Sequence, residues 1–274
     1  MRPEDYDIMH ALEADYWWFA GMRQVVGALL GRHVLRPPRD IADVGCGTGI
    51  NMLWMAQQFR PERIIGCDYS SIALGWCRET LKGARSYSAR LIPRLSQGDV
   101  RKLPFAGSSF DLVTCLDVLD SFPPDGEDMA GLSELHRILR PGGMALVREP
   151  AYRWLLSSHD EVFETKHRYT AAELRRKMAR VGFEVVRSTY ANTLLFPVAA
   201  ARRLLRKGVG LAADKTDAQP WPDWLQWLNT PFRGCLRVEA YWLSRGLNLP
   251  FGLSVICIGR KKANSPAVSA EGFR

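Results

Sequence analysis

The sequence predicts an α/β fold built on a doubly wound, mostly parallel sheet. Two observations support this prediction: short apolar runs alternate with helix-forming segments along most of the chain, and a glycine-rich turn directly follows the first apolar run. The 274 residues are 47% hydrophobic and 24% charged, which is the composition of a globular protein. This composition excludes a disordered or fibrous chain.

Six apolar runs have the length and the bounding turn residues of strands. Glycines close the first run, and the third run is long enough for a strand that is buried on both faces. In chain order the predicted strands are 41–44, 63–67, 110–116, 144–147, 183–188 and 254–260.

Four helices are predicted between these strands, and three of them carry recognisable end signals. A serine at position 70 or 71 can cap the second helix. Leu139 closes an apolar stripe ahead of the Pro-Gly-Gly sequence at 141–143, which we expect to end the third helix. Thr170 and Glu173 form a capping box that begins the fourth. In chain order the predicted helices are 52–59, 70–81, 132–139 and 170–182.

We expect one domain over residues 1–262, because the two segments that interrupt the alternation are interpreted as insertions that face the substrate. One is a polar and aromatic segment at about 151–170, and the other is a segment rich in Trp, Pro and Arg at about 191–251. The remaining parts are an N-terminal lid at about 1–35 and a core at about 36–150, 171–190 and 252–262. Residues 263–274 are rich in Ser, Ala and Gly, which predicts a disordered tail.

Charge, cysteine content and hydropathy narrow the class of protein only partly. The formal net charge of +8 is compatible with nucleic acid, an anionic membrane or an anionic substrate, and it selects none of them. The six cysteines form no C-x-x-C pair, so neither a zinc site nor a redox dithiol is indicated, and we expect no metal. The polar N-terminus does not resemble a signal peptide, and the longest apolar stretch, 194–201, is too short to span a bilayer. We therefore expect a reduced, cytoplasmic protein.

The most informative stretch reads Asp-Val-Gly-Cys-Gly-Thr-Gly and begins at Asp43, inside the first predicted strand. Gly45, Gly47 and Gly49 let the backbone turn tightly and approach a ligand without Cβ clashes. The third glycine of the dinucleotide-binding fingerprint is missing, because isoleucine stands in its place. A second acid, Asp68, follows the next strand, where a carboxylate can accept hydrogen bonds from both hydroxyl groups of a ribose.

Further short motifs follow in order: Gly98-Asp99-Val100, Leu103-Pro104-Phe105, Phe110-Asp111-Leu112-Val113, Leu116-Asp117-Val118-Leu119 and Leu139-Arg140-Pro141-Gly142-Gly143. With the glycine turn, they resemble the class I S-adenosylmethionine-dependent methyltransferases over roughly residues 40–150. The resemblance implies a Rossmann-like, seven-stranded sheet with a helical cap, and S-adenosylmethionine as the cofactor. It also implies methyl transfer to an O, N or C atom of a small apolar or anionic metabolite, in a secondary-metabolite or a polysaccharide- or lipid-linked pathway.

The flanking segments resemble a narrower subgroup, the methyltransferase type 11 proteins. The marks of this subgroup are Tyr16-Trp17-Trp18-Phe19, Ser158-His159-Asp160, His167-Arg168-Tyr169-Thr170 and Leu249-Pro250-Phe251-Gly252-Leu253-Ser254. One departure is Asp120-Ser121, where relatives usually carry Glu-His, so a histidine often suspected of catalysis is missing here.

The resemblance also implies which residues hold the cofactor. Asp99 is expected to meet the adenine amino group, and Asp43 to hold the loop or, through water, the methionine ammonium group. Arg23 can reach the methionine carboxylate or remain a solvated helix residue. Trp18 belongs to an aromatic cluster that either closes over the sulfonium or packs in the core. The expected cofactor-binding residues are Asp43, Gly45, Cys46, Gly47, Gly49, Asp68, Tyr69, Asp99, Val100, Leu116, Trp18 and Arg23.

Methyl transfer from a sulfonium is an in-line displacement, so alignment and the exclusion of water are the main tasks of the protein. An O–H or N–H acceptor also benefits from a base. His159 is the first candidate for that base, with Asp160 orienting it, although both can equally pin the insertion. Asp117, at the end of a strand, either contacts donor or acceptor or caps a loop. His167 is interpreted as a structural residue beside the helix that begins at Thr170.

The Trp- and Arg-rich insertion allows three interpretations: a helical cap on the sheet, a lid over an apolar acceptor, or a contact with an anionic membrane surface. Its tryptophans at 221, 224 and 227 have helical spacing. The rival functions are a scaffold that binds the cofactor without turnover and, less well supported, a nucleic-acid methyltransferase. The Asn/Asp-Pro-Pro-aromatic and Pro-Cys motifs of that second rival are absent, so no nucleic-acid partner is expected.

Overall fold

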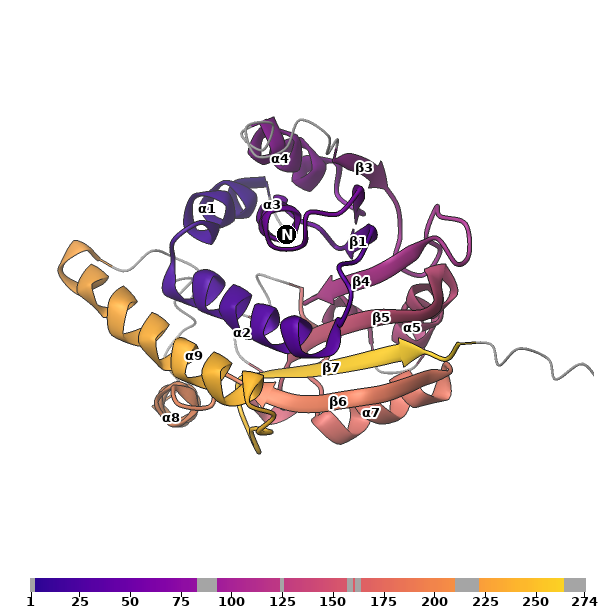
Figure 1. Cartoon of the computed structure of the whole chain (residues 1–274). Helices are drawn as coiled ribbons and strands as arrows, with labels where there is room; N and C mark the ends of the chain where they lie inside the picture. The colour runs from indigo at the N-terminus through magenta and orange to yellow at the C-terminus, as the bar shows by residue number, and fades with distance from the viewer. Residues whose placement is uncertain are drawn as a thin grey trace, which may run out of the picture.

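The computed structural model describes residues 3–82, 93–123, 126–156, 160, 164–209 and 222–263. Within this part of the chain, seven strands form one sheet in the order β3-β2-β1-β4-β5-β7-β6 (Figure 1). The strands are β1 (Asp40–Val44), β2 (Arg63–Asp68), β3 (Arg94–Gln97), β4 (Phe110–Leu116), β5 (Leu139–Pro150), β6 (Phe183–Ala191) and β7 (Ser254–Lys261). The predicted seven-stranded α/β fold is therefore confirmed.

The sheet is parallel except at one strand. Strands β3, β2, β1, β4 and β5 pair in parallel, whereas β7 lies antiparallel between β5 and β6. The carboxyl ends of β1, β2, β4, β5 and β6 consequently lie along the same side of the sheet. We call this side the carboxyl edge, and the side with the opposite strand ends the amino edge. In an open α/β sheet, this edge is where ligands bind.

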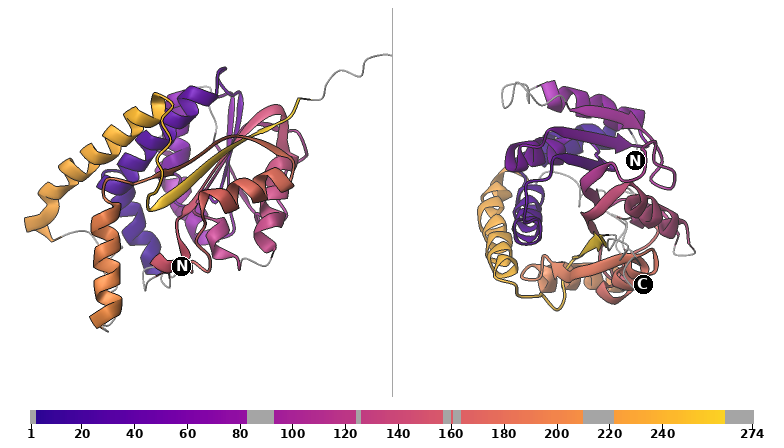
Figure 2. Two further views of the ribbon diagram at one scale, coloured as in Figure 1. Left: turned by 90° about the horizontal axis from the view of Figure 1, so that it is seen from below. Right: turned by 45° about the vertical axis from the view of Figure 1, so that its right-hand side comes forward.

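Helices cover both faces of the sheet and leave it buried as a middle layer (Figure 2). Apolar side chains of α2, α3, α4 and α9 form the core on one face, and those of α5 and α7 form it on the other. The α-helices are α1 (Pro3–Glu13), α2 (Trp17–His33), α3 (Ile50–Phe59), α4 (Ser71–Lys82), α5 (Glu127–Ile138), α7 (Ala171–Arg180), α8 (Phe196–Val209) and α9 (Asn229–Ser244). The short 3₁₀ helices are η2 (Leu119–Ser121), η3 (Arg153–Leu155) and η5 (Asp223–Leu228).

Most predicted elements are present, with two corrections. The capping box is real, since the side chain of Thr170 accepts a hydrogen bond from the backbone N–H of Glu173 at the start of α7. The third helix ends before Leu139, not at the Pro-Gly-Gly sequence, because Leu139 is extended, fully buried and paired with Phe110. Strand β5 therefore begins earlier than predicted. Strand β3 was not among the predicted runs, because it is a short edge strand without an apolar run.

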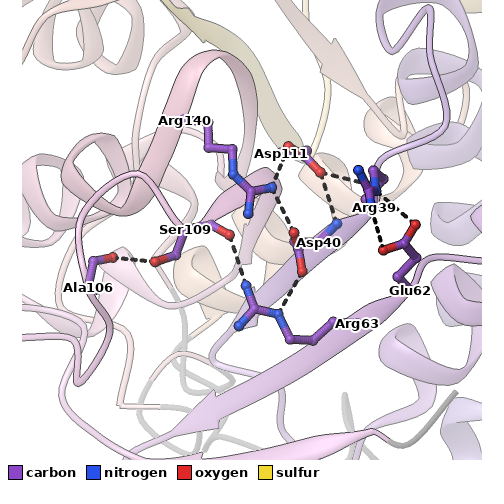
Figure 3. A network of polar contacts seen from close by, with 8 residues as sticks. All are labelled: Arg39, Asp40, Glu62, Arg63, Ala106, Ser109, Asp111 and Arg140. Atoms are coloured by element: carbon purple, nitrogen blue, oxygen red, sulfur yellow. Dashed lines mark hydrogen bonds and ion pairs between the residues drawn. The ribbon is translucent and has the colours of Figure 1, made fainter.

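The amino ends of the strands carry a network of ion pairs (Figure 3). Asp40 contacts Arg63 at 2.6 Å and Arg140 at 2.7 Å, and Arg140 also contacts Asp111 at 2.7 Å. The other oxygen of Asp111 accepts hydrogen bonds from the backbone N–H groups of Asp40 and Arg39. These side chains tie β1, β2, β4 and β5 together at the edge opposite the expected ligand site.

Among the residues that the structure describes, no helix is both long enough and apolar enough to cross a membrane. The predicted disordered tail lies outside the described residues from 264 onward, as does Trp221 of the Trp-rich insertion.

Candidate cofactor and acceptor site

The glycine turn lies between β1 and α3 and needs its glycines for two reasons. Gly45, Gly47 and Gly49 all have positive φ, at 74°, 54° and 89°, where other residues are strained. A Cβ at Gly45 would also clash with Val118, and one at Gly49 would clash with Cys77. At Gly47 an added Cβ would meet only Met9 among the described residues, at an ordinary 3.8 Å, so φ and not space is what requires glycine there.

Asp68, at the end of β2, fastens this turn. Its carboxylate accepts hydrogen bonds of 2.9 Å from the backbone N–H groups of Gly47 and Ser70. Burial raises the pKa of Asp68, although the backbone hydrogen bonds oppose that shift. Asp99, the next predicted acid, pairs with Arg101 at 2.6 Å, and the hydrogen bonds from Arg101 lower its pKa. The structure thus places both predicted acids at or near the carboxyl ends of adjacent strands, with Asp68 hydrogen-bonded to the glycine turn.

Asp43 is a buried acid with one unused oxygen. Its Oδ1 accepts a hydrogen bond of 2.6 Å from the hydroxyl of Thr114, whereas its buried Oδ2 has no partner among the described residues. Burial raises the pKa of Asp43 to about 7. A buried acceptor without a partner is costly, so this oxygen marks a place where a donor or a cation would be stabilised.

A second buried acid, Glu13, faces the same turn from the end of α1. Its carboxylate accepts a hydrogen bond from the hydroxyl of Thr48 in the glycine turn. Burial raises the pKa of Glu13 to about 8, Arg23 lowers it and the charge of Asp43 raises it. The guanidinium of Arg23 donates to the backbone carbonyls of Glu13 and Ala14, which holds the end of α1 in place. Sequence reasoning missed Glu13, because one acid in a polar N-terminal segment has no distinguishing pattern.

Asp117 follows β4 with a positive φ of 57° and forms an ion pair with Arg148 of β5. The guanidinium of Arg148 lies over the ring of Trp18, 5.0 Å from its centroid. The predicted aromatic residue Trp18 and the predicted acid Asp117 are therefore joined through one arginine. Cation–π contact with Arg148 shows that this ring face suits a positive charge.

Two more buried acids, Asp120 and Glu149, meet beside Asp117. Glu149 accepts hydrogen bonds of 3.1 and 3.0 Å from the backbone N–H groups of Leu119 and Asp120. Asp120 accepts a hydrogen bond from the hydroxyl of Thr165, and burial together with the charge of Asp117 raises its pKa to about 7. Burial also raises the pKa of Glu149. Neither was a predicted site residue, although Asp120 stands at the position where the sequence departs from its relatives.

The predicted catalytic pair is only partly described. His159 lies outside the described residues, so its role as a base stays a prediction. The buried carboxylate of Asp160 pairs with Arg168 at 2.7 Å, and Arg168 also donates to the carbonyl of Ala151. His167 contacts Glu173 of α7 at 2.8 Å, in the structural position expected for it.

The other predicted cofactor residues lie around the same edge of the sheet. Cys46 and Val100 are buried, Leu116 is half-buried, and Tyr69 is largely exposed next to Asp68. Within the described residues, no group of three or more His, Cys, Asp or Glu side chains has the arrangement of a metal site.

An aromatic cluster extends this edge beyond β5. Tyr152 lies two residues after the end of β5 and has a positive φ of 61°. Its ring stacks on Tyr190 of β6 at 5.3 Å and on Trp154 at 6.0 Å. Phe196 packs against Tyr152 and Trp154 and, at 5.3 Å, against Phe251. Trp154 and Phe251 remain partly exposed, so the cluster presents apolar surface at the edge of the sheet where ligands bind.

A seven-stranded sheet with a single antiparallel strand, a glycine turn after β1 and acids after β2 and β3 define a class I S-adenosylmethionine-dependent methyltransferase fold. Residues 42–147 match the family described as Methyltransferase domain. The predicted resemblance is therefore confirmed, and S-adenosylmethionine is the cofactor of this class.

Similar proteins include curated methyltransferases that align over part of the chain. A fatty-acid O-methyltransferase of Mycolicibacterium smegmatis is 31% identical over 155 residues, or 56% of this chain and 51% of that protein. A demethylmenaquinone methyltransferase of Listeria welshimeri is 36% identical over 105 residues, or 38% of this chain and 42% of that protein. The aligned part of the chain thus spans about half, or less, of the length of these relatives.

Similar solved structures share the fold at low sequence identity. The [4+2]-cyclase SpnF aligns with a TM-score of 0.57 and 20% identity, covering 88% of this chain and 81% of that one. A putative sarcosine dimethylglycine methyltransferase from Galdieria sulphuraria aligns with a TM-score of 0.56 and 13% identity, covering 87% and 84%. At these identities the likeness establishes the fold alone.

Proposed function

We propose that the chain transfers the methyl group of S-adenosylmethionine to an O, N or C atom of a small, apolar acceptor by in-line displacement. One observation carries the proposal: a buried carboxylate oxygen of Asp43, two residues before the glycine turn, has no partner among the described residues. The cofactor supplies an electrophilic methyl group on a sulfonium, and it carries an ammonium group that a carboxylate can bind.

The residues around the turn fit such a cofactor. Asp43 and Glu13 approach from β1 and α1 and would hold the ammonium group between two carboxylates. Asp68 keeps further lone pairs for ribose hydroxyls while its backbone hydrogen bonds fix the turn. Asp99 is ionised by its pair with Arg101 and can accept a hydrogen bond from the adenine amino group.

The aromatic cluster around Tyr152 supports an apolar acceptor. Stacked rings bury apolar area and exclude water, which favours a displacement on a cationic donor. Two of the similar proteins are named for a fatty acid and for demethylmenaquinone, which agrees with an acceptor of this character. We assign His159 as the base for an O–H or N–H acceptor, Asp160 as the residue that positions the segment carrying it, and Asp117 as a contact where donor and acceptor meet.

A second candidate function is a cofactor-binding protein that does not transfer the methyl group. The sequence favours this candidate at one position, Ser121, because serine cannot act as a base as the histidine common among relatives could. The adjacent Asp120 is buried and hydrogen-bonded to Thr165, so it does not replace that histidine as an accessible base.

The decisive experiment is calorimetric titration of the purified protein with S-adenosylmethionine and with its demethylated product. We expect micromolar binding of both ligands, lost in Asp68→Ala and retained in Asp111→Ala, whose acid lies at the opposite edge of the sheet. Absence of binding in the wild type would overturn the proposal. Turnover is then measured as transfer of a labelled methyl group to fatty acids, quinols and phosphorylated metabolites. Binding without transfer to any of these acceptors would favour the second candidate.

A further inference from the structure

Helix α9 has one face that belongs to the core and another that has no partner among the described residues. Leu236, Ala240 and Leu243 are buried in the core that includes α2. The other face carries Arg237, Tyr241 and Arg245, four residues apart in turn, and Val238 beside them, and all four side chains are exposed. Figures 1 and 2 show α9 on the outside of α2, at the surface of the molecule.

The turn of helix that precedes α9 continues this exposed surface with two tryptophans. Trp224 and Trp227 of η5 are 73% and 66% exposed. Because a 3₁₀ helix has three residues per turn, residues three apart lie on the same side. Two large aromatic side chains exposed side by side are unusual on a protein surface that has no partner.

This surface is basic. Between Trp224 and Phe251 the sequence contains three arginines and one acid, Glu239. Glu239 is buried, and its carboxylate accepts hydrogen bonds from the backbone N–H groups of Asn192 and Leu194. The exposed side of α9 therefore carries arginine charges and a tyrosine ring, and the one acid of α9 is buried, whereas η5 adds two tryptophans and begins with one acid, Asp223.

We propose that η5 and the outer face of α9 dock on an anionic lipid surface. Tryptophan and tyrosine favour the boundary between headgroups and acyl chains, because their rings are apolar at one end and polar at the other. Arginine can bury its stem beside them while its guanidinium contacts lipid phosphate. The guanidinium of Arg245 already lies over the ring of Tyr241, at 5.9 Å, which keeps charge and ring on the same surface.

Charge also argues against a second copy of the chain as the occupant. Two copies that met through this surface would bring the arginines of α9 close to one another, and α9 has no exposed acid to neutralise them. An anionic bilayer supplies the complementary charge over the whole surface and an apolar layer for the rings. The proposal does not depend on methyl transfer.

Co-sedimentation with vesicles tests the proposal. The full chain is incubated with vesicles of phosphatidylcholine alone and with vesicles containing about one third phosphatidylglycerol, at low and high salt. We expect binding to the anionic vesicles that weakens with salt and falls about tenfold in Trp224→Ser/Trp227→Ser and in Arg237→Gln/Arg245→Gln. Circular dichroism confirms that the variants fold.

The matched control is Arg175→Gln/Arg176→Gln on α7, which removes the same charge from an exposed helix on the opposite face of the sheet. This variant should bind like the wild type. Equal losses in the control and in the α9 variant would mean that net charge, not this surface, drives binding, and would overturn the proposal. A wild type that does not bind anionic vesicles, or a dimer in light scattering that the tryptophan variant abolishes, would overturn it as well.

Discussion

The two edges of the sheet carry acids in opposite environments. At the amino edge, each acid has arginine partners and partial access to water (Figure 3). Hydrogen bonds from Arg39 lower the pKa of Glu62, and those from Arg140 and the backbone outweigh burial and lower the pKa of Asp111. These acids are ionised at neutral pH and hold neighbouring strands together.

At the carboxyl edge, Asp99 and Asp117 also have arginine partners, but four other acids are buried and their pKa values move upward. Burial raises the pKa of Glu13 to about 8 and those of Asp43 and Asp120 to about 7, and it also raises the pKa of Glu149. This difference shows that residue type alone does not distinguish acids that stabilise the sheet from acids that could bind a ligand. An acid in an ion pair stabilises the packing of neighbouring strands, whereas a buried acid with a raised pKa is a candidate for binding a ligand or a proton.

Substitution of Arg168 is expected to cause the largest loss of stability. Its partner Asp160 is an acid at the carboxyl edge that is buried and also forms an ion pair. The side chains of Arg168 and Asp160 are only 5% and 4% exposed. Arg168→Met would remove the guanidinium that pairs with this buried carboxylate, and we expect a loss of about 3–5 kcal/mol of unfolding free energy. Urea denaturation measures the change.

The double variant Arg168→Met/Asp160→Leu is the control for that experiment. Removing both charges should recover most of the lost stability, because no uncompensated charge remains. A loss below about 1 kcal/mol in the single variant would mean that this pair contributes no more than an ordinary surface ion pair. It would contradict the view that acids at the carboxyl edge differ from those at the amino edge.

Asp111 gives a smaller effect at the amino edge. Asp111→Ala removes the acceptor for Arg140 and for two backbone N–H groups, and we expect a loss of about 1–2 kcal/mol, since the side chain is 30% exposed and partly screened by water. The folded-state pKa of Asp111 is lowered, so its contribution is present above the unfolded pKa and is lost as the pH falls through the folded value. Urea midpoints at pH 7 and near pH 3 measure this change. An equal loss at both would contradict the ionic role.

Sequence patterns predicted those parts of the molecule that depend on local chemistry. The alternation of apolar runs predicted most of the sheet, and the glycine turn placed Asp43 and Asp68 at its carboxyl edge. Strand β3 was not predicted because a short strand at the outer side of the sheet needs no apolar run. Leu139 was assigned to a helix from its apolar spacing, but it pairs with Phe110 of β4 and is a strand residue. Helix signals and strand signals compete at such a boundary, and tertiary pairing decides.

Most of the electrostatics of the site could not be predicted from the sequence. Glu13 reaches the glycine turn only because α1 folds back over it, a contact between residues 35 positions apart. Asp120 and Glu149 are buried together because η2 follows β4 closely enough for its backbone to bond the end of β5. A pattern in one segment carries no information about contacts of this kind.

Glu13 gives the smallest but most specific effect. At pH 6 its carboxyl group is mostly protonated, since its pKa is about 8, and Glu13→Gln then resembles the wild type in charge and shape. At pH 9 the wild type presents a carboxylate and the variant does not. We therefore expect Glu13→Gln to bind S-adenosylmethionine as the wild type does at pH 6 and about tenfold more weakly at pH 9, since one lost charge contact is worth about 1.4 kcal/mol.

The comparison between variants at each pH cancels the titration of the ligand's own amino group, which ionises near the same pH. Calorimetry in buffers of different ionisation enthalpy adds a second reading, because the wild type should release protons on binding near pH 7.5 and Glu13→Gln should release fewer. Glu79→Gln, at an exposed acid paired with Lys82 on α4, is the control and should change neither quantity. A tenfold loss at both pH values would mean that Glu13 acts through its hydrogen bond to Thr48 and not through its charge. The raised pKa values at the carboxyl edge would then reflect burial alone, as they would in a protein whose edge binds no cation.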